Sequence, residues 1–246
     1  MNLAGYAINF FKNAYTLYFA KKLLRSNGIN VCKWDVVEAT VFIEIFFKRT
    51  YSYCFPFNKK CTIVDIGSHK GYFALYASRN VAEGSKIYAI EPEAENFRVL
   101  TNNLKMNSID NVTPCNSAIA GSTGQRELYI TNSVNHTLFK NDQKGDIKKV
   151  VNTLSFFDFC KNNNIDSIDF LKVDCEGAEY EIIESINSEL VKKIKTIAIE
   201  FHDLQDGKNS SSTIIDFLRQ NGFTIIKYNF QQIPTTEHMG IIIATR

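Results

Sequence analysis

The chain has 246 residues, of which 45% are hydrophobic and 22% charged, and 28 basic against 26 acidic side chains give a net charge of +2. This composition is that of an ordinary globular protein whose core needs neither disulfides nor metal, and it excludes collagenous and low-complexity chains. The near-neutral charge disfavours a protein that binds nucleic acid through bulk positive charge. The six cysteines show no C-x-x-C or zinc-finger spacing, so we expect reduced thiols in a cytoplasmic protein.

Residues 1–60 are predicted to form a helical extension or cap and not a separate domain. A first helix is expected from the helical spacing of its apolar residues, which are Leu3, Ala7, Phe10, Ala14 and Leu17. One lysine and several asparagines lie inside this stretch, so a membrane span is not expected. We expect the helix to pack on the protein's own core, with peripheral contact to a membrane or partner left open. A second helix is expected at about Trp34–Phe47.

Residues 61–246 are predicted to form one α/β domain, because short apolar runs alternate with helical patterns from Thr62 onward. This alternation predicts a mostly parallel sheet with helices on both faces. The last two runs are nearly adjacent and suit an antiparallel pair. The predicted strands are Thr62–Gly67, Lys86–Glu91, Val112–Ile119, Asp169–Asp174, Thr196–Phe201, Thr224–Tyr228 and Gly240–Ala244.

Residues 124–151 interrupt the alternation. A strand is expected at Arg126–Ile130, followed by a polar loop from Thr131 to Lys149 that contains four lysines. A polar insertion of this length in a compact domain is typical of a lid or of a disordered segment.

The first candidate binding segment runs from Asp65 to Gly71, where a buried strand enters a glycine-containing turn and then a helix. Gly67 and Gly71 allow a ligand to approach the backbone closely. A dinucleotide needs a glycine-dense turn that faces its pyrophosphate, whereas here a carboxylate ends the strand. Asp65 suits a ligand with an ammonium group, so a dinucleotide oxidoreductase is a distant alternative. For Lys70, in the same turn, contact with a carboxylate is the alternative and a position in solvent is the favoured expectation.

The second segment ends at Glu91, 26 residues after Asp65. In nucleotide-binding α/β folds, an acidic residue at this position accepts hydrogen bonds from ribose hydroxyls. Its alternative role is to cap the helix that begins near Glu93. A glycine turn and a spaced acid without a dinucleotide loop predict an adenosine ligand that lacks phosphates, of which S-adenosylmethionine is the common example.

The third segment is a strand that ends at Asp174 and is followed by Glu176, Gly177 and Glu179. Ligands of open parallel sheets bind beyond the carboxyl ends of the strands, so the acids that end the three strands are expected to crowd one edge. Glu176 and Glu179 also suit the first turn of a helix, where acids complement the helix dipole. For Glu176 the structural and the functional interpretation both stay open.

The three segments together resemble the FkbM-type family of S-adenosylmethionine-dependent methyltransferases, over about residues 61–202. The K-x-D-x-E-G-A-E core, from Lys172 to Glu179, is the most specific part. The resemblance implies a Rossmann-like class I sheet of seven strands with one reversed strand. It also implies methyl transfer to a hydroxyl of a sugar, glycan or small secondary metabolite.

The same resemblance assigns roles in cofactor binding. Asp65, Gly67 and Gly71 match the first cofactor motif, and Ser68 lies in the same turn. Glu91 corresponds to the ribose carboxylate, Ser117 lies beside adenine, and Asp174 lies near the methionine end. The helical cap and the insertion at 124–151 are expected to shape the acceptor site.

Methyl transfer to a hydroxyl benefits from a base that removes the proton. The candidate catalytic residues are Asp174, Glu176 and His202, with His136 in the insertion as a weaker candidate. Asp174 together with Glu200, His202 and Asp203 has the donor types of a divalent-cation site. No sequence feature requires an ion there, so no metal is predicted.

Two other functions remain open. An RNA methyltransferase is the first, because the lysines at 140–149 and 192–195 suit phosphate contacts, although the net charge disfavours it. The second is a cofactor-binding scaffold without transferase activity. The acceptor's identity and the oligomeric state are not predicted.

Overall fold

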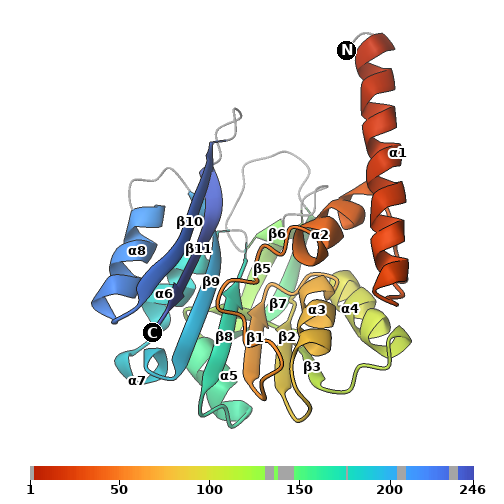
Figure 1. The fold of residues 1–246 in the computed structure, drawn as a ribbon. Coiled ribbons are helices and arrows are strands. Elements are labelled where there is room, and N and C mark those ends of the chain that lie inside the picture. The colour runs from red at the N-terminus through yellow and green to blue at the C-terminus, as the bar shows by residue number, and fades with distance from the viewer. Residues whose placement is uncertain (1–2, 131–135, 138–146, 176, 204–208, 233–237) are drawn as a thin grey trace.

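The computed structural model describes residues 3–130, 136–137, 147–175, 177–203, 209–232 and 238–246 (Figure 1). Its main sheet has seven strands in the order β10-β11-β9-β8-β1-β2-β3. β11 is antiparallel to both of its neighbours, and the other neighbouring pairs are parallel. The strands are β1 (Thr62–Ile66), β2 (Lys86–Ile90), β3 (Val112–Cys115), β8 (Ile168–Val173), β9 (Ile194–Asp203), β10 (Thr224–Gln232) and β11 (His238–Thr245). The predicted α/β sheet with one reversed strand and a final antiparallel pair is confirmed.

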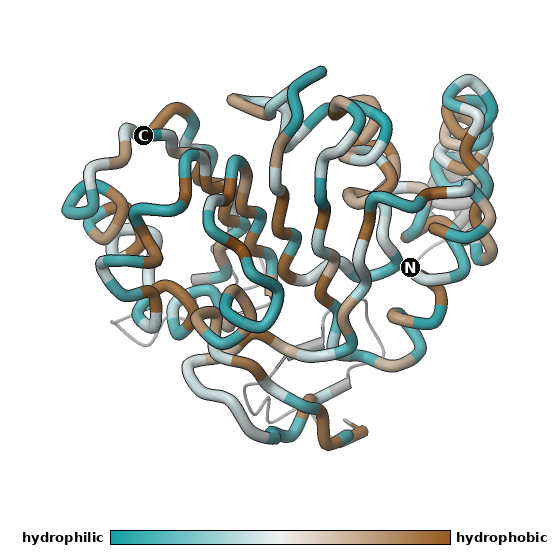
Figure 2. Tube along the Cα trace, turned by 90° about the horizontal axis from the view of Figure 1, so that it is seen from below, coloured by the Kyte–Doolittle hydropathy of each residue, from teal (hydrophilic) through white to brown (hydrophobic). Residues whose placement is uncertain are grey.

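Helices cover both faces of this sheet, because buried strands alternate their side chains between two apolar layers. Ile63 and Phe170 belong to the layer under α2 (Val36–Phe46), α3 (Tyr72–Asn80) and α4 (Ala94–Met106). Val64 and Leu171 belong to the opposite layer, which also contains side chains of four further helices. These are α5 (Phe156–Asn162), α6 (Glu179–Ser185), α7 (Ser188–Val191) and α8 (Ser211–Gln220). Figure 2 shows the hydrophobic stretches gathered in the central strands.

The N-terminal helix α1 (Leu3–Ser26) differs from the prediction in how it packs. Its lower part contacts α2, and its N-terminal half stands clear of the body (Figure 1). Within residues 12–26, the buried side chains are Ala20 and Leu24, whereas Ala14 of the predicted core face is exposed. The predicted packing of the whole helix on the core is therefore wrong for its described upper part. Among the described helices, none is long and apolar enough to cross a membrane.

The insertion belongs to a second sheet with the order β4-β7-β5-β6. Its strands are β4 (Ala118–Ala120), β5 (Gly124–Ile130), β6 (His136–Thr137) and β7 (Ile147–Ser155). The predicted single strand Val112–Ile119 is wrong, because the chain leaves the main sheet after Cys115 and enters the second sheet at Ala118. The predicted loop is wrong at its end, since Lys148 and Lys149 pair with β5. Residues 131–135 and 138–146 of that loop lie outside the described residues.

Candidate functional site

A pocket of about 280 Å³ lies at the edge of the main sheet where the parallel strands end. The turns that follow β1, β2 and β8 contribute Gly67, Glu91 and Asp174 to its wall. The predicted crowding of three acids at this edge is confirmed for Glu91 and Asp174, whereas Asp65 is buried and does not line the pocket. The wall also contains side chains of α2 and Leu128 of β5.

Gly67 brings the first and third segments into backbone contact. Its φ is +79°, and a Cβ atom at this position would lie 1.7 Å from the carbonyl oxygen of Asp174. The backbone N–H of Asp174 donates to the carbonyl of Ile66 at 3.1 Å, which holds the two chain segments together. Only glycine fits here. Ser68 lines the pocket and donates from Oγ to the carbonyl of Asp65, and Gly71 begins α3 with a φ of +82°.

Glu91 is buried at the pocket wall and both of its carboxylate oxygens accept backbone hydrogen bonds. Oε2 accepts from the N–H of His69 at 2.8 Å, and Oε1 accepts from the N–H of Glu93 at 2.9 Å. Burial raises the pKa of Glu91 to about 7, against the lowering effect of these bonds. Since each carboxylate oxygen has two lone pairs, the group retains capacity to accept further hydrogen bonds from a ligand. Ser117 and Leu128 also line the pocket.

Asp65 is fully buried and does not line the pocket among the described residues. The ammonium group that faces it belongs to Lys172, whose Nζ lies 3.1 Å from Oδ1 of Asp65. The same Nζ lies 3.2 Å from Oδ2 of Asp174 and donates to the carbonyl of Gly67 at 3.2 Å. Burial opposes the charge of Lys172, but Asp174 and Asp65 hold its pKa above the usual value. Lys172 therefore joins the first and third segments electrostatically.

Lys172 is a member of the site that was not predicted from the sequence. The available signal was a lysine after the apolar pair Phe170–Leu171, two residues before the acid that ends the predicted strand. Alternation in a strand places the side chains of residues 172 and 174 on the same face. In the sheet, Lys172 also stands directly opposite Asp65.

Tyr51, in the turns that follow α2, lines the pocket. Its hydroxyl donates to Oε2 of Glu200 at 2.8 Å and, at 3.4 Å, to Oδ2 of Asp174. Its ring lies 5.4 Å from the ammonium group of Lys172. Burial and the charge of Asp174 raise the pKa of Glu200 to about 7. No sequence signal distinguished Tyr51 from the other aromatic residues of the first 60.

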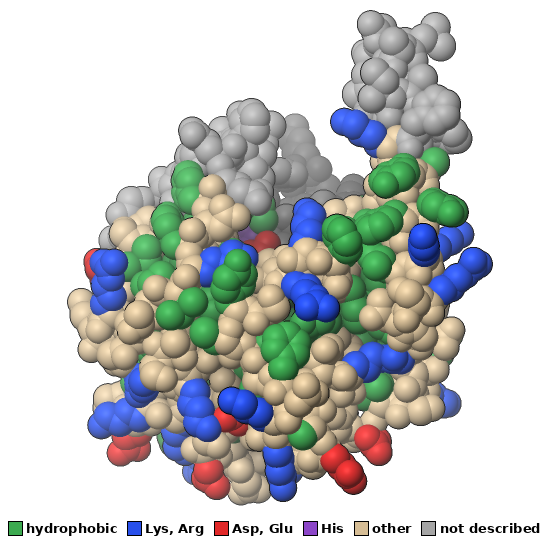
Figure 3. Space-filling model, viewed as in Figure 1, with side chains coloured by type: hydrophobic (Ala, Val, Ile, Leu, Met, Phe, Trp, Pro, Cys, Tyr) green, Lys and Arg blue, Asp and Glu red, His purple; other side chains and the backbone are tan. Residues whose placement is uncertain are grey.

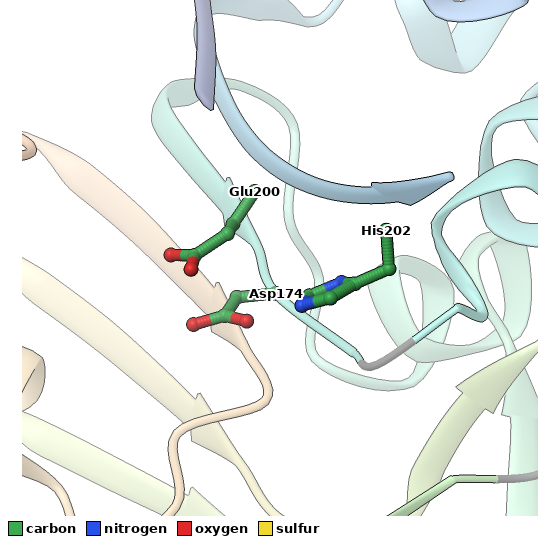
Figure 4. Close-up of side chains that lie close together, drawn as sticks. All are labelled: Asp174, Glu200 and His202. Carbon is green, nitrogen blue, oxygen red and sulfur yellow. The ribbon is translucent and has the colours of Figure 1, made fainter. Parts of the chain in front are cut away.

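His202 lies beside these acids and is held by Glu179. Figure 4 shows the imidazole of His202 turned toward Asp174, with Glu200 next to it. Nδ1 of His202 is 3.1 Å from Oε1 of Glu179. Glu179 is fully buried and also accepts the N–H groups of Cys175 and Gly177. The first-turn acid of α6 thus fixes the ring of a histidine at the end of β9.

The remaining catalytic candidates from the sequence are Glu176 and His136. Glu176 lies outside the described residues. His136 lies in β6 and pairs with Ile130 of β5. The side chains of His136 and Asp203 are not described. His69, which has a φ of +48°, lines the pocket.

Lys70 follows the alternative of contact with a carboxylate and not the favoured position in solvent. Its ammonium group forms an ion pair with Glu38 of α2, a side chain that is 1% exposed, and does not point into solvent. The carbonyl of Lys70 also accepts a hydrogen bond from Asn103 of α4. The turn after β1 is therefore attached to the cap helix as well as to the sheet.

Asp174, Glu200 and His202 form a group of possible metal ligands. Each offers one ligand atom, and these atoms lie within 4.8 Å of one another. Carboxylate and imidazole groups suit several divalent cations. However, Asp174 already faces the ammonium group of Lys172, and Glu200 accepts from Tyr51. Within the protein, Lys172 thus supplies this cluster with a positive charge, and Tyr51 supplies it with a hydrogen-bond donor.

The sequence of this chain is similar to those of known methyltransferases. The methyltransferase FkbM domain family matches residues 65–225. "Methyltransferase 1" of Beauveria bassiana is 26% identical over 223 residues, which cover 82% of this chain and 88% of the relative. "Methyltransferase sdnD" of Sordaria araneosa is 25% identical over 258 residues, covering 92% of this chain and 96% of the relative.

Solved structures share the fold at low identity. The METTL16 methyltransferase domain has a TM-score of 0.50 and 14% identity, covering 94% of this chain and 79% of that domain. A putative rRNA methylase from Clostridium thermocellum has the same TM-score and identity, covering 81% of this chain and 95% of that protein. At this identity the likeness concerns the fold alone.

Proposed function

This chain belongs to the FkbM methyltransferase family and uses S-adenosylmethionine as its methyl donor, and we propose that it methylates a hydroxyl oxygen of a sugar, glycan or small secondary metabolite. The observation that carries the proposal is the Glu179–His202 pair, which lies behind the pocket wall and turns its imidazole toward the pocket residue Asp174. An oriented imidazole is suited to take a proton from a hydroxyl.

The residues of the pocket suit the cofactor's chemistry. Glu91 would accept hydrogen bonds from the ribose hydroxyls, since its buried carboxylate retains lone pairs. Ser117 and Leu128 would flank adenine, and Ser68 would line the path to the methionine end. Asp174 would face the ammonium group of the methionine part. Gly67 and Gly71 would shape the backbone of the turn at the pocket. Asp65 would act through its ion pair with Lys172.

When bound, the cofactor supplies an electrophilic methyl group on a sulfonium sulfur. The residues of the site would need to hold the acceptor oxygen in line with that methyl group. His202 would receive the hydroxyl proton, while Glu179 holds Nδ1 and stabilises the resulting imidazolium. Tyr51 and Glu200 would orient the acceptor. Glu176, which the sequence also made a catalytic candidate, has no step in this scheme.

The helical cap and the insertion would have separate tasks. Val41, Glu44 and Ile45 of α2 line the pocket together with Tyr51, so residues 1–60 would form the acceptor side. Leu128 is the described insertion residue that lines the pocket, so residues 124–151 would cover the adenine side. The carboxylate of Glu44 on the acceptor side disfavours the RNA alternative, because it repels phosphate.

The test is an acceptor screen with methyl-labelled cofactor. Sugars, glycans and hydroxylated metabolites are incubated with the wild type, with His202→Ala and with the surface control Lys105→Ala. We expect O-methylated product from the wild type and the control, and loss of turnover in His202→Ala with unchanged calorimetric affinity for S-adenosylhomocysteine. Full activity of His202→Ala would remove the base from the mechanism. Binding of S-adenosylhomocysteine without methylation of any acceptor would favour the scaffold alternative.

A further inference from the structure

The N-terminal helix α1 has a composition unlike the rest of the chain. Residues 1–34 contain five basic side chains and no Asp or Glu. Six of the 24 residues in α1 are aromatic. The basic residues are Lys12, Lys21, Lys22, Arg25 and Lys33.

Aromatic side chains on the described part of α1 are exposed. Tyr15 and Tyr18 are each 70% exposed. Phe19 stacks on Tyr15 with a centroid distance of 6.4 Å, and it meets the ring of Phe47 edge-on at 5.0 Å. Phe47, which follows α2, is itself 59% exposed. The aromatic surface therefore continues from α1 onto the body of the protein.

The position of α1 makes this surface accessible. Figure 1 shows α1 rising beyond the edge at which the parallel strands end, which is the edge of the pocket. Figure 3 shows hydrophobic and basic side chains along the described part of the helix, without an acidic one. Lys21 and Lys22 are both exposed near the base of this projection.

We propose that α1 docks the protein onto an anionic lipid bilayer surface. Exposed tyrosines suit the interface between headgroups and acyl chains, and lysines beside them are attracted by anionic headgroups. A second copy of the chain is a poorer occupant, because pairing two α1 helices would bring together basic side chains without any acidic partner on either helix. The charge of the helix therefore complements a negative surface and opposes self-association.

The test is co-sedimentation with vesicles of phosphatidylcholine alone and of phosphatidylcholine mixed equally with phosphatidylglycerol. We expect binding to the mixed vesicles, weak binding to the neutral ones, and release by about 1 M salt, which screens surface charge. Lys21→Glu/Lys22→Glu should weaken binding at least about 25-fold, since each basic residue near such a surface contributes about fivefold. Tyr15→Ser/Tyr18→Ser should weaken it several-fold.

The matched control is Lys86→Glu/Lys105→Glu, which reverses two exposed charges on other elements. It should bind the mixed vesicles like the wild type, and all variants should retain their affinity for S-adenosylhomocysteine. Absence of binding to the mixed vesicles would overturn the proposal. Equal loss in the control and in Lys21→Glu/Lys22→Glu would also overturn it, as would a dimer in light scattering that Tyr15→Ser/Tyr18→Ser dissociates while vesicles stay unbound.

Discussion

Oε1 of Glu179 lies 3.1 Å from Nδ1 of His202, and the same buried carboxylate accepts two backbone N–H groups from the turn after β8. The turn that carries Asp174 and the histidine that ends β9 are thus held by one side chain. A neutral imidazole oriented in this way donates from Nδ1 to the carboxylate and has its acceptor nitrogen at Nε2.

This relationship predicts that Glu179→Gln lowers kcat by about 100-fold or more, because the amide no longer fixes the ring or stabilises its charged form. KM for the cofactor should change little. His202→Ala should cost about as much, and the double variant little more, since the two residues act as a unit. Steady-state kinetics test these changes in kcat and KM, and the melting temperature of each variant checks that it is folded. A kcat of Glu179→Gln near that of the wild type would contradict it.

Lys172 should be required for stability, since its removal leaves Asp65 and Asp174 buried or half-buried without a counter-charge. We expect Lys172→Met to lower the free energy of unfolding by about 3–5 kcal/mol. Lys172→Met/Asp65→Asn should recover part of this loss. The control is Lys195→Met, whose partner is Asp169 and whose side chain is 66% exposed, with an expected loss of at most about 1 kcal/mol. Urea unfolding measures all three, and equal losses at the two lysines would refute the prediction.

Gly67 and Gly222 form a matched pair, because both have a φ of +79°. A Cβ atom at Gly222 would meet open space, so Gly222→Ala should cost only the backbone strain of about 1–2 kcal/mol. At Gly67 the same atom would strike the carbonyl of Asp174. Gly67→Ala should therefore destabilise the protein considerably more and abolish S-adenosylhomocysteine binding. Similar melting temperatures and affinities for the two variants would show that the close approach is not needed.

Glu200 should make stability depend on pH. Its pKa is about 7 in the folded protein and about 4.5 in the unfolded chain, so between these values the folded state retains a proton that the unfolded state releases. Its contribution to stability is therefore fully present below about pH 4.5 and is lost as the pH rises through about 7. Glu200→Gln should remove up to about 3 kcal/mol of this decline. Unfolding curves across this range test it, and an equally steep decline in the variant would contradict the shift.

Methyl transfer should survive chelation of divalent cations. Asp174, Glu200 and His202 have suitable donor atoms, but Lys172 already supplies positive charge beside Asp174. We expect turnover in excess EDTA to equal that without it, and added Mg²⁺ or Mn²⁺ to have little effect. Loss of activity in EDTA with recovery by one of these ions would assign the cluster to a metal.

The sheet and the acids at its edge were predictable for a physical reason. Buried parallel strands form short apolar runs, and the residues that end them meet at one edge whatever the loops between them do. Asp174 and Glu91 were found in this way. The second sheet was not, because β4 begins only three residues after β3 ends and because β7 begins with lysines that resemble a loop.

The site contacts that were not predicted join residues that are far apart in the sequence, and a single sequence does not show such pairings. The pairing of Asp65 with Lys172 requires the register of β1 and β8. Tyr51 meets Asp174 across 123 residues of chain, and nothing near Tyr51 marks it. Glu179 was interpreted as a first-turn acid, and it is one, but its contact with His202 follows only from the packing of α6 beside β9.

The measurement that tests the account most directly is the chemical position of the transferred methyl group. A cofactor with a trideuterated methyl group is incubated with the wild type and His202→Ala, together with hydroxylated compounds and their amino analogues, and products are analysed by mass spectrometry and NMR. The account predicts a labelled methyl group on oxygen with the wild type and none with His202→Ala. A label on nitrogen or carbon, or an unchanged O-methyl yield in His202→Ala, would contradict it.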